Sequence, residues 1–198
     1  MTAGAGTFQV IMTAPRLAEP AVAVLEQAGC TIHYMPPYPS AEAVAALAGE
    51  VQAHAILTRQ GPVNAAAMDA SKQLRVVARH GVGVDDVDLA AAAARGILVT
   101  RAPGSNTVAV AEHTIALMLA LARRLYPAAA TMKEGRWEKS ALEGVEVRER
   151  VLGLVGLGRI GTLVASKAKA LEMHVLAYDP YISAERAASL GVELGALE

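Results

Sequence analysis

Residues 151–161 of this chain read VLGLVGLGRIG, a short apolar segment that leads into a G-x-G-x-x-G pattern. An apolar-periodic helix follows, then the apolar segment HVLAY at residues 174–178, and then Asp179. This order of strand, glycine turn, helix, strand and acid is that of a dinucleotide-binding unit. The alternative, a glycine-rich turn that binds no ligand, is disfavoured because the acid ends a strand at the required separation, about 20 residues on.

The parts of the glycine pattern have separate physical roles. Gly156 allows a tight turn, Gly158 lets the backbone approach a pyrophosphate because it has no Cβ, and Gly161 allows the helix to pack closely on the strand. The helix begins near Arg159 and Ile160, where unpaired N–H groups and the positive end of the helix dipole face the phosphates.

The acid at residue 179 selects the cofactor. The Asp179 carboxylate can accept the ribose hydroxyls, whereas it would repel the 2′-phosphate of NADP. Residues 180–182 offer no arginine to receive such a phosphate. The expected cofactor is therefore NAD.

The composition excludes several classes of protein. With 198 residues, 54% of them hydrophobic and 4% aromatic, the chain suits helices packed on buried parallel strands. A net charge of −1 gives no electrostatic case for nucleic acid, and the apolar stretch at 108–122 is too polar and too short for a membrane span.

Cys30 is the single cysteine and is expected to be a small buried residue. A single cysteine excludes an internal disulfide and fits a reducing, cytoplasmic location. Residues 1–6 lack the pattern of a signal peptide.

The first hundred residues alternate strand and helix patterns, which predicts a flavodoxin-like parallel sheet with helices on both faces. The expected strands are residues 8–12, 31–34, 55–57, 74–78 and 97–100. After Pro103 the pattern changes to a helix capped by Ser105 or Asn106 that runs to about residue 125, and a second helix from Pro127 to residue 133. We therefore predict an α/β chain with an N-terminal domain at 1–103 and the first part of a Rossmann domain at 104–198.

Several further segments occur in the order that one family shows. They are RHGVGVD at 79–85, Asn106 with VAEH at 110–113, MKEGRWE at 132–138 and YDP at 178–180. Together with the glycine pattern, this ordered set resembles the D-isomer-specific 2-hydroxyacid dehydrogenases, most closely their phosphoglycerate dehydrogenase-like branch.

The resemblance implies an NAD-dependent oxidoreductase of small 2-hydroxy or 2-oxo acids, with a phosphoglycerate-like or a hydroxypyruvate- or glyoxylate-like substrate. It implies that the substrate carboxylate lies against the backbone N–H groups of Gly81, Val82 and Gly83. Arg59 and Asn106 match positions that face the substrate, and a guanidinium can pair with a carboxylate or a phosphate. The alternative interpretations are an ordinary surface arginine for Arg59 and a helix cap for Asn106.

The resemblance also implies a homodimer through residues 105–137, an alanine- and leucine-rich helix pair with more apolar face than one small domain needs. The family's catalytic arginine, glutamate and histidine follow the ribose-binding acid and would lie beyond Glu198. We therefore expect a C-terminally truncated member that contains no catalytic residue, has no turnover on its own and leaves its sheet open beside residues 151–155. His80 and His113 are interpreted as packing or capping residues, and no metal-binding spacing is present.

Two other interpretations stay open. The chain could be a non-catalytic NAD-binding sensor or interaction module, or a truncated product without a stable function.

Overall fold

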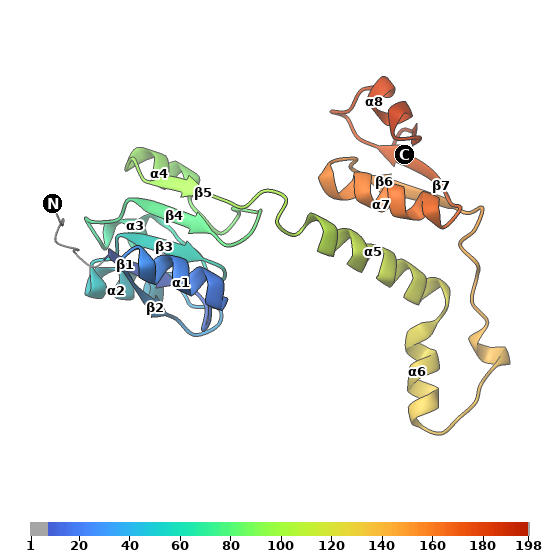
Figure 1. The fold of residues 1–198 in the computed structure, drawn as a ribbon, viewed down its shortest axis with the longest axis horizontal. Helices are drawn as coiled ribbons and strands as arrows, with labels where there is room; N and C mark the ends of the chain where they lie inside the picture. The colour runs from blue at the N-terminus through green and yellow to red at the C-terminus, as the bar shows by residue number, and fades with distance from the viewer. Residues whose placement is uncertain (1–7, 198) are drawn as a thin grey trace. The chain divides into compact units, whose positions relative to one another are not determined.

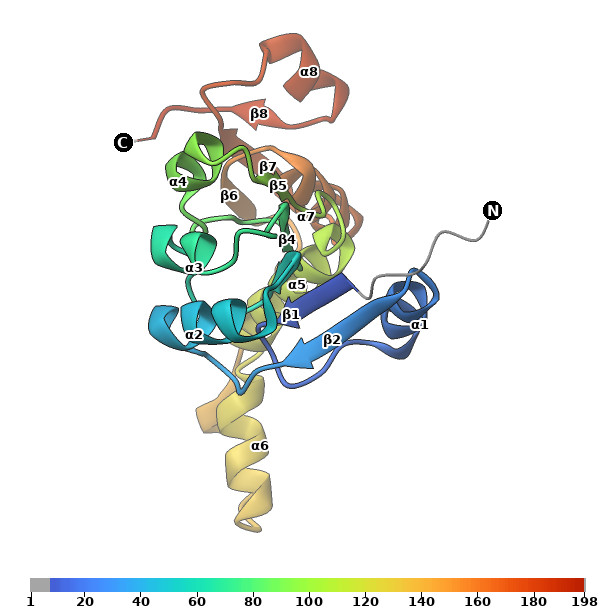
Figure 2. The same cartoon turned by 90° about the vertical axis from the view of Figure 1, so that its left-hand side faces the viewer.

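The computed structural model describes residues 8–197, so residues 1–6, where no signal peptide is expected, lie outside the described part. The chain forms two compact units that divide between Ser105 and Asn106, here called unit 1 and unit 2. Figures 1 and 2 label their helices and strands in chain order.

Unit 1 is built on a parallel sheet with the strand order β2-β1-β3-β4-β5. The strands are β1 (Phe8–Met12), β2 (Cys30–Tyr34), β3 (Ala55–Thr58), β4 (Val76–Arg79) and β5 (Leu98–Thr100). Each lies within two residues of its expected position. This strand order is the flavodoxin-like one. After β2 is added on one side of β1, the later strands are added on the other side, so the switch point of the order lies between β1 and β3. The predicted fold class of the first unit is thereby confirmed.

The helices of unit 1 cover both faces of the sheet unequally. They are α1 (Glu19–Gln27), α2 (Ala41–Val51), α3 (Ala65–Asp69) and α4 (Leu89–Ala94). Figure 2 shows α2, α3 and α4 along one face and α1 on the other. Ser40, Asn64 and Asp88 cap α2, α3 and α4, since each side chain accepts a backbone N–H from the first turn.

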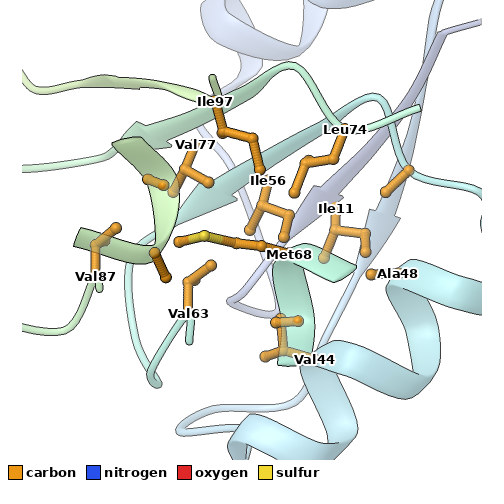
Figure 3. Packing of buried hydrophobic residues seen from close by; sticks show 14 of the residues in the cluster. Ile11, Val44, Ala48, Ile56, Val63, Met68, Leu74, Val77, Val87 and Ile97 are labelled. Carbon is orange, nitrogen blue, oxygen red and sulfur yellow. The ribbon is translucent and has the colours of Figure 1, made fainter. Parts of the chain in front are cut away.

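The core of unit 1 lies between the sheet and α2, α3 and α4. Ile11, Ile56 and Val77 point from three strands toward Val44 on α2 and Met68 on α3, and all five are at most 2% exposed (Figure 3). Burying such a side chain contributes about 1.5–3 kcal/mol. This packing fixes the strands whose carboxyl ends carry the candidate substrate residues.

Unit 2 contains a three-stranded parallel sheet in the order β6-β7-β8. Its elements are β6 (Val151–Val155), α7 (Arg159–Ala170), β7 (His174–Tyr178), α8 (Ala184–Ser189) and β8 (Glu193–Leu194). This is the βαβαβ pattern of one half of a Rossmann fold, as expected. Within the described residues β6 is an edge strand, and Val151 and Val155 are 65% and 74% exposed, so the predicted open edge is confirmed.

Two helices and a short 3-10 turn precede this sheet: α5 (Thr107–Ala122), α6 (Leu125–Lys133) and η1 (Ser140–Leu142). Helix α5 packs against α7, whereas α6 projects away from the sheet of unit 2 (Figure 1). The prediction that Pro127 opens the second helix was wrong by two residues, because Arg124 adopts a left-handed φ of 51° and the helix starts directly after it. Between residues 8 and 197, no helix is long and apolar enough to cross a membrane.

Candidate nucleotide and substrate sites

The glycine turn of unit 2 joins β6 to α7. Gly156 has a φ of +98°, a conformation that side chains other than glycine rarely adopt. A Cβ on Gly161 would collide with the carbonyl oxygen of Gly156. Gly161 therefore allows the start of α7 to lie close to the Gly156 carbonyl within the turn. The sequence had suggested instead that Gly161 allows the helix to pack on the strand.

Gly158 is different because none of the residues that the structure describes requires a glycine there. It is exposed, and a Cβ at this position would have no atom within 4 Å. The first hydrogen bond of α7 runs from the Thr162 N–H to the Gly158 carbonyl at 2.9 Å. The N–H groups of Arg159, Ile160 and Gly161 have no acceptor among residues 8–197. The site thus presents an open backbone and free helix-terminal donors, which suits a phosphate group.

Asp179 follows β7 and holds the glycine turn. Its Oδ2 accepts the Leu157 N–H at 2.7 Å, and its Oδ1 accepts the Tyr181 N–H at 2.9 Å. These two hydrogen bonds hold the pKa of the Asp179 carboxyl below its usual value, and the one from the Leu157 N–H has the larger effect. The group is therefore a carboxylate, and its remaining lone pairs can accept further donors such as ribose hydroxyls. Its anchoring of the turn had not been predicted.

In unit 1, Arg59 directly follows β3. The N–H groups of Arg59 and Gln60 donate to the hydroxyl of buried Thr13, after β1, at 3.0 and 3.3 Å. The Arg59 side chain is exposed and makes no hydrogen bond or ion pair with residues 8–197. Thr13 thus fixes the backbone of a segment whose guanidinium stays free.

Arg59 lines a cavity of about 460 Å³ at the carboxyl ends of β1, β3 and β4. The lining residues are Arg16, Leu17, Ala18, Glu19, Arg59 and His80. Ligands of open α/β sheets bind outside the carboxyl ends of the strands where the strand order reverses, which here is between β1 and β3. Arg16 was not predicted. The sequence had suggested a flavodoxin-like strand order, and this rule, applied to that order, points to the segment after β1.

The glycine loop after β4 offers fewer donors than expected. The Gly81 N–H is already bonded to the Arg79 carbonyl at 2.9 Å. The N–H groups of Val82 and Gly83 have no acceptor in the described part of the chain. An anion can therefore be held by two consecutive amides of this loop.

Arg79, the last residue of β4, ties the substrate segments together and was missed by the sequence analysis. Its Nε donates to the Gly83 carbonyl at 2.8 Å, and its Nη1 donates to the Arg59 carbonyl at 2.7 Å. Nη1 also lies 3.1 Å from the Asp86 carboxylate. One guanidinium thus sets the spacing between the Arg59 segment and the glycine loop.

Three further expectations need correction. Asn106 occupies the position before α5, but its side chain forms no capping hydrogen bond. His80 and His113 are exposed, and His80 lines the cavity, so neither is a packing residue. Cys30 is half-buried where full burial was expected.

This chain is similar in sequence and fold to known proteins. The sequence profile of the D-isomer specific 2-hydroxyacid dehydrogenase catalytic domain matches residues 10–191. The D-3-phosphoglycerate dehydrogenase of Archaeoglobus fulgidus is 50% identical over 139 residues, covering 70% of this chain and 26% of the relative. That of Mycobacterium tuberculosis is 47% identical over 153 residues, covering 77% and 29%. The chain therefore spans less than a third of the length of these relatives.

Solved structures agree with the sequence comparison. A protein of Thermus thermophilus superposes with a TM-score of 0.86 at 32% identity, covering 96% of this chain and 60% of its own. The D-lactate dehydrogenase of Escherichia coli superposes with a TM-score of 0.78 at 26% identity and with the same coverage of 96% and 60%. With the profile matched over most of its length, this chain belongs to the D-isomer-specific 2-hydroxyacid dehydrogenase family.

Proposed function

We propose that the full-length protein carrying this sequence is an NAD-dependent oxidoreductase that interconverts small D-2-hydroxy acids and 2-oxo acids. The observation that supports it most is the glycine turn of unit 2, where three free amides at the start of α7 lie in the same βαβ unit as the charged Asp179. Unit 1 adds a cavity with exposed arginines, which fits an anionic substrate. The family membership links these two features to one reaction.

The nucleotide site fits the adenosine and pyrophosphate part of NAD. The amides of Arg159, Ile160 and Gly161 would bind the pyrophosphate, to which the backbone of Gly158 is open, and Asp179 would accept the ribose hydroxyls. When bound, NAD supplies the acceptor or donor of a hydride. We expect NAD to bind more tightly than NADP, because the Asp179 carboxylate repels a 2′-phosphate; equal or tighter binding of NADP in a fluorescence titration would refute this.

The substrate site is proposed to lie in unit 1. The free amides of Val82 and Gly83 would hold the substrate carboxylate, and the Arg59 guanidinium would pair with an anionic oxygen of the substrate. These residues bind and orient. The resemblance assigns proton transfer to a histidine held by a carboxylate, and carbonyl polarisation to an arginine. In the family these residues follow the ribose-binding acid, and we assign neither role within residues 8–197.

We also propose a homodimer through residues 105–137 and a cytoplasmic location. The exposed large apolar side chains of this segment are Val108, Leu117, Leu121, Leu125, Tyr126, Met132 and Trp137. Exposed apolar side chains on α5, on α6 and just after α6 suit a self-complementary two-fold interface.

The test is NADH oxidation by the full-length protein with a panel of 2-oxo acids, comparing the natural protein with Arg59→Gln. Arg59→Gln should lower kcat/KM by about 10- to 100-fold, the effect of losing one charge-assisted hydrogen bond, and leave NADH affinity unchanged. Binding of NADH without turnover of any 2-oxo acid would favour the non-catalytic sensor instead.

A further inference from the structure

Thr13, which directly follows β1, is a polar residue with no exposed surface. Its hydroxyl oxygen accepts the N–H groups of Arg59 and Gln60 at 3.0 and 3.3 Å, and the hydroxyl donates to the Thr58 hydroxyl oxygen at 3.4 Å. A hydroxyl has one hydrogen and two lone pairs, so all of its hydrogen-bonding capacity is in use. Thr13 therefore acts on a substrate only through the residues that it holds.

The peptide group between Arg59 and Gln60 is held at both of its polar ends. Its carbonyl oxygen accepts a hydrogen bond from Nη1 of Arg79 at 2.7 Å, and its N–H donates to Thr13. No other acceptor among the described residues serves this N–H or the N–H of Arg59. Without the Thr13 hydroxyl, the peptide keeps one contact and is free to rotate about it.

The chain is fixed again directly after this peptide. Gly61 has a φ of +79°, and a Cβ there would collide with the Pro39 carbonyl oxygen. Only glycine allows the two backbone segments to lie this close. The peptide held by Thr13 therefore lies between two fixed points, the Arg79 contact and Gly61.

This peptide decides where the Arg59 side chain starts. The Arg59 guanidinium is exposed and has no hydrogen bond or ion pair with residues 8–197, so no side-chain contact orients it. Arg79 links the backbone of residue 59 to the glycine loop, since it also bonds the Gly83 carbonyl. A rotation of the peptide would therefore change the distance from the guanidinium to the free amides of Val82 and Gly83.

We infer that Thr13 is a positioning residue for the substrate: by holding this peptide, it sets the distance between the Arg59 guanidinium and the amides of Val82 and Gly83. This inference rests on the proposed function. Loss of the hydroxyl would leave two N–H groups without an acceptor, and the peptide would turn toward another one. A displacement of about 1 Å in a substrate-positioning group can cost about 100-fold in rate.

The experiment measures NADH oxidation by the full-length protein with the 2-oxo acid that it reduces fastest among pyruvate, glyoxylate, hydroxypyruvate and 3-phosphohydroxypyruvate. Thr13→Val keeps the shape of the side chain and removes the hydroxyl, whereas Thr13→Ser keeps the hydroxyl. Ser71→Ala is the matched control. The Ser71 hydroxyl is also buried, donates to the Ala53 carbonyl at 2.9 Å and accepts the Gln73 N–H at 3.2 Å, but it lies before β4, at the opposite end of the sheet.

Thr13→Val should raise KM for the 2-oxo acid by about tenfold and leave NADH affinity unchanged, because only the placement of Arg59 is lost. Thr13→Ser should stay within about threefold of the natural protein, because it keeps the donor and both acceptor sites. Ser71→Ala should lower the denaturant midpoint about as much as Thr13→Val does, yet leave KM unchanged. If Thr13→Val does not fold, Thr13→Ala tests the same loss.

A double-mutant cycle separates positioning from a general structural effect. In the Arg59→Gln background, Thr13→Val should change KM by less than about twofold, because the side chain through which it acts is gone. An equal rise in KM with and without the Arg59 side chain, or no rise in the natural background, would overturn the role of Thr13 alone. No turnover of any of the four acids by the natural protein would overturn the proposed function, and the inference with it.

Discussion

Arg79 connects the substrate site, because its guanidinium contacts both backbone segments proposed to hold the substrate. We expect Arg79→Leu to destabilise the fold by about 1–3 kcal/mol, since the Asp86 carboxylate and two carbonyls lose a charged donor. The KM for the 2-oxo acid should rise more than in Arg59→Gln, whose side chain supports no other residue. Denaturant unfolding and steady-state kinetics check both effects, and unchanged stability together with unchanged KM would contradict the assignment.

Asp179 makes a pH-dependent contribution to stability. Its pKa is lowered in the folded chain, so its contribution is present above the ordinary carboxyl value of about 4 and is lost as the pH falls through the lowered folded value. Asp179→Asn should remove this contribution, so that its stability falls less between pH 5 and pH 2 than that of the natural chain. Parallel unfolding curves for the two proteins over that range would contradict the role of the carboxylate.

Single residues were predicted from the sequence where a chemical pattern demanded them, and missed where only the fold brings them together. Gly156 and Asp179 belong to a local pattern of fixed spacing, and both lie where it required. Arg79 carries no such pattern, because its contact with the Arg59 carbonyl joins residues on two different strand ends. Its role became visible only once β3 and β4 lay side by side.

At the scale of elements, the turn from β6 to α7 makes two glycines separable by experiment. Gly161→Ala should destabilise unit 2 by about 1–3 kcal/mol, because the added Cβ meets the Gly156 carbonyl. Gly158→Ala should leave stability within about 0.5 kcal/mol, because its Cβ enters open space, yet weaken NAD binding at least tenfold by blocking the backbone approach. Calorimetry of unfolding and of NAD binding checks the pair; Gly158→Ala with normal NAD affinity would contradict the site.

The strands of unit 1 were predicted with small errors at their ends, whereas α8 and β8 were not predicted individually. Capping residues such as Ser40, Asn64 and Asp88 set the starts of three helices, and alternating apolar segments set the strands. The helix pair at 105–137 was less predictable because it lacks such signals: Asn106 does not cap α5, and a left-handed residue, Arg124, separates the helices.

At the scale of the whole molecule, we expect the full-length protein to be a dimer at micromolar concentration. If obligate, the interface through residues 105–137 should bury more than about 2,000 Å². Leu121, 82% exposed on α5, is placed to test it. Leu121→Glu should convert the dimer to a monomer in sedimentation, whereas Val24→Glu, at a 65% exposed position on α1, should not. A natural protein that sediments as a monomer would rule the interface out.

The sequence was sufficient to recognise the family at this scale, because its motifs occur in family order over nearly the whole chain. The substrate was not predictable, since it depends on side chains that only the folded cavity brings together. We also assign no catalytic acid or base to any residue between 8 and 197.

The central claim is tested most directly by the chirality of the product that the full-length protein forms from NADH and a 2-oxo acid. Chiral separation of the product after NADH oxidation reports cofactor, substrate class and stereochemistry in one measurement. Our account predicts the D-2-hydroxy acid, formed in amounts equal to the NADH consumed. An L-product, or no NADH-dependent product with any 2-oxo acid, would contradict it.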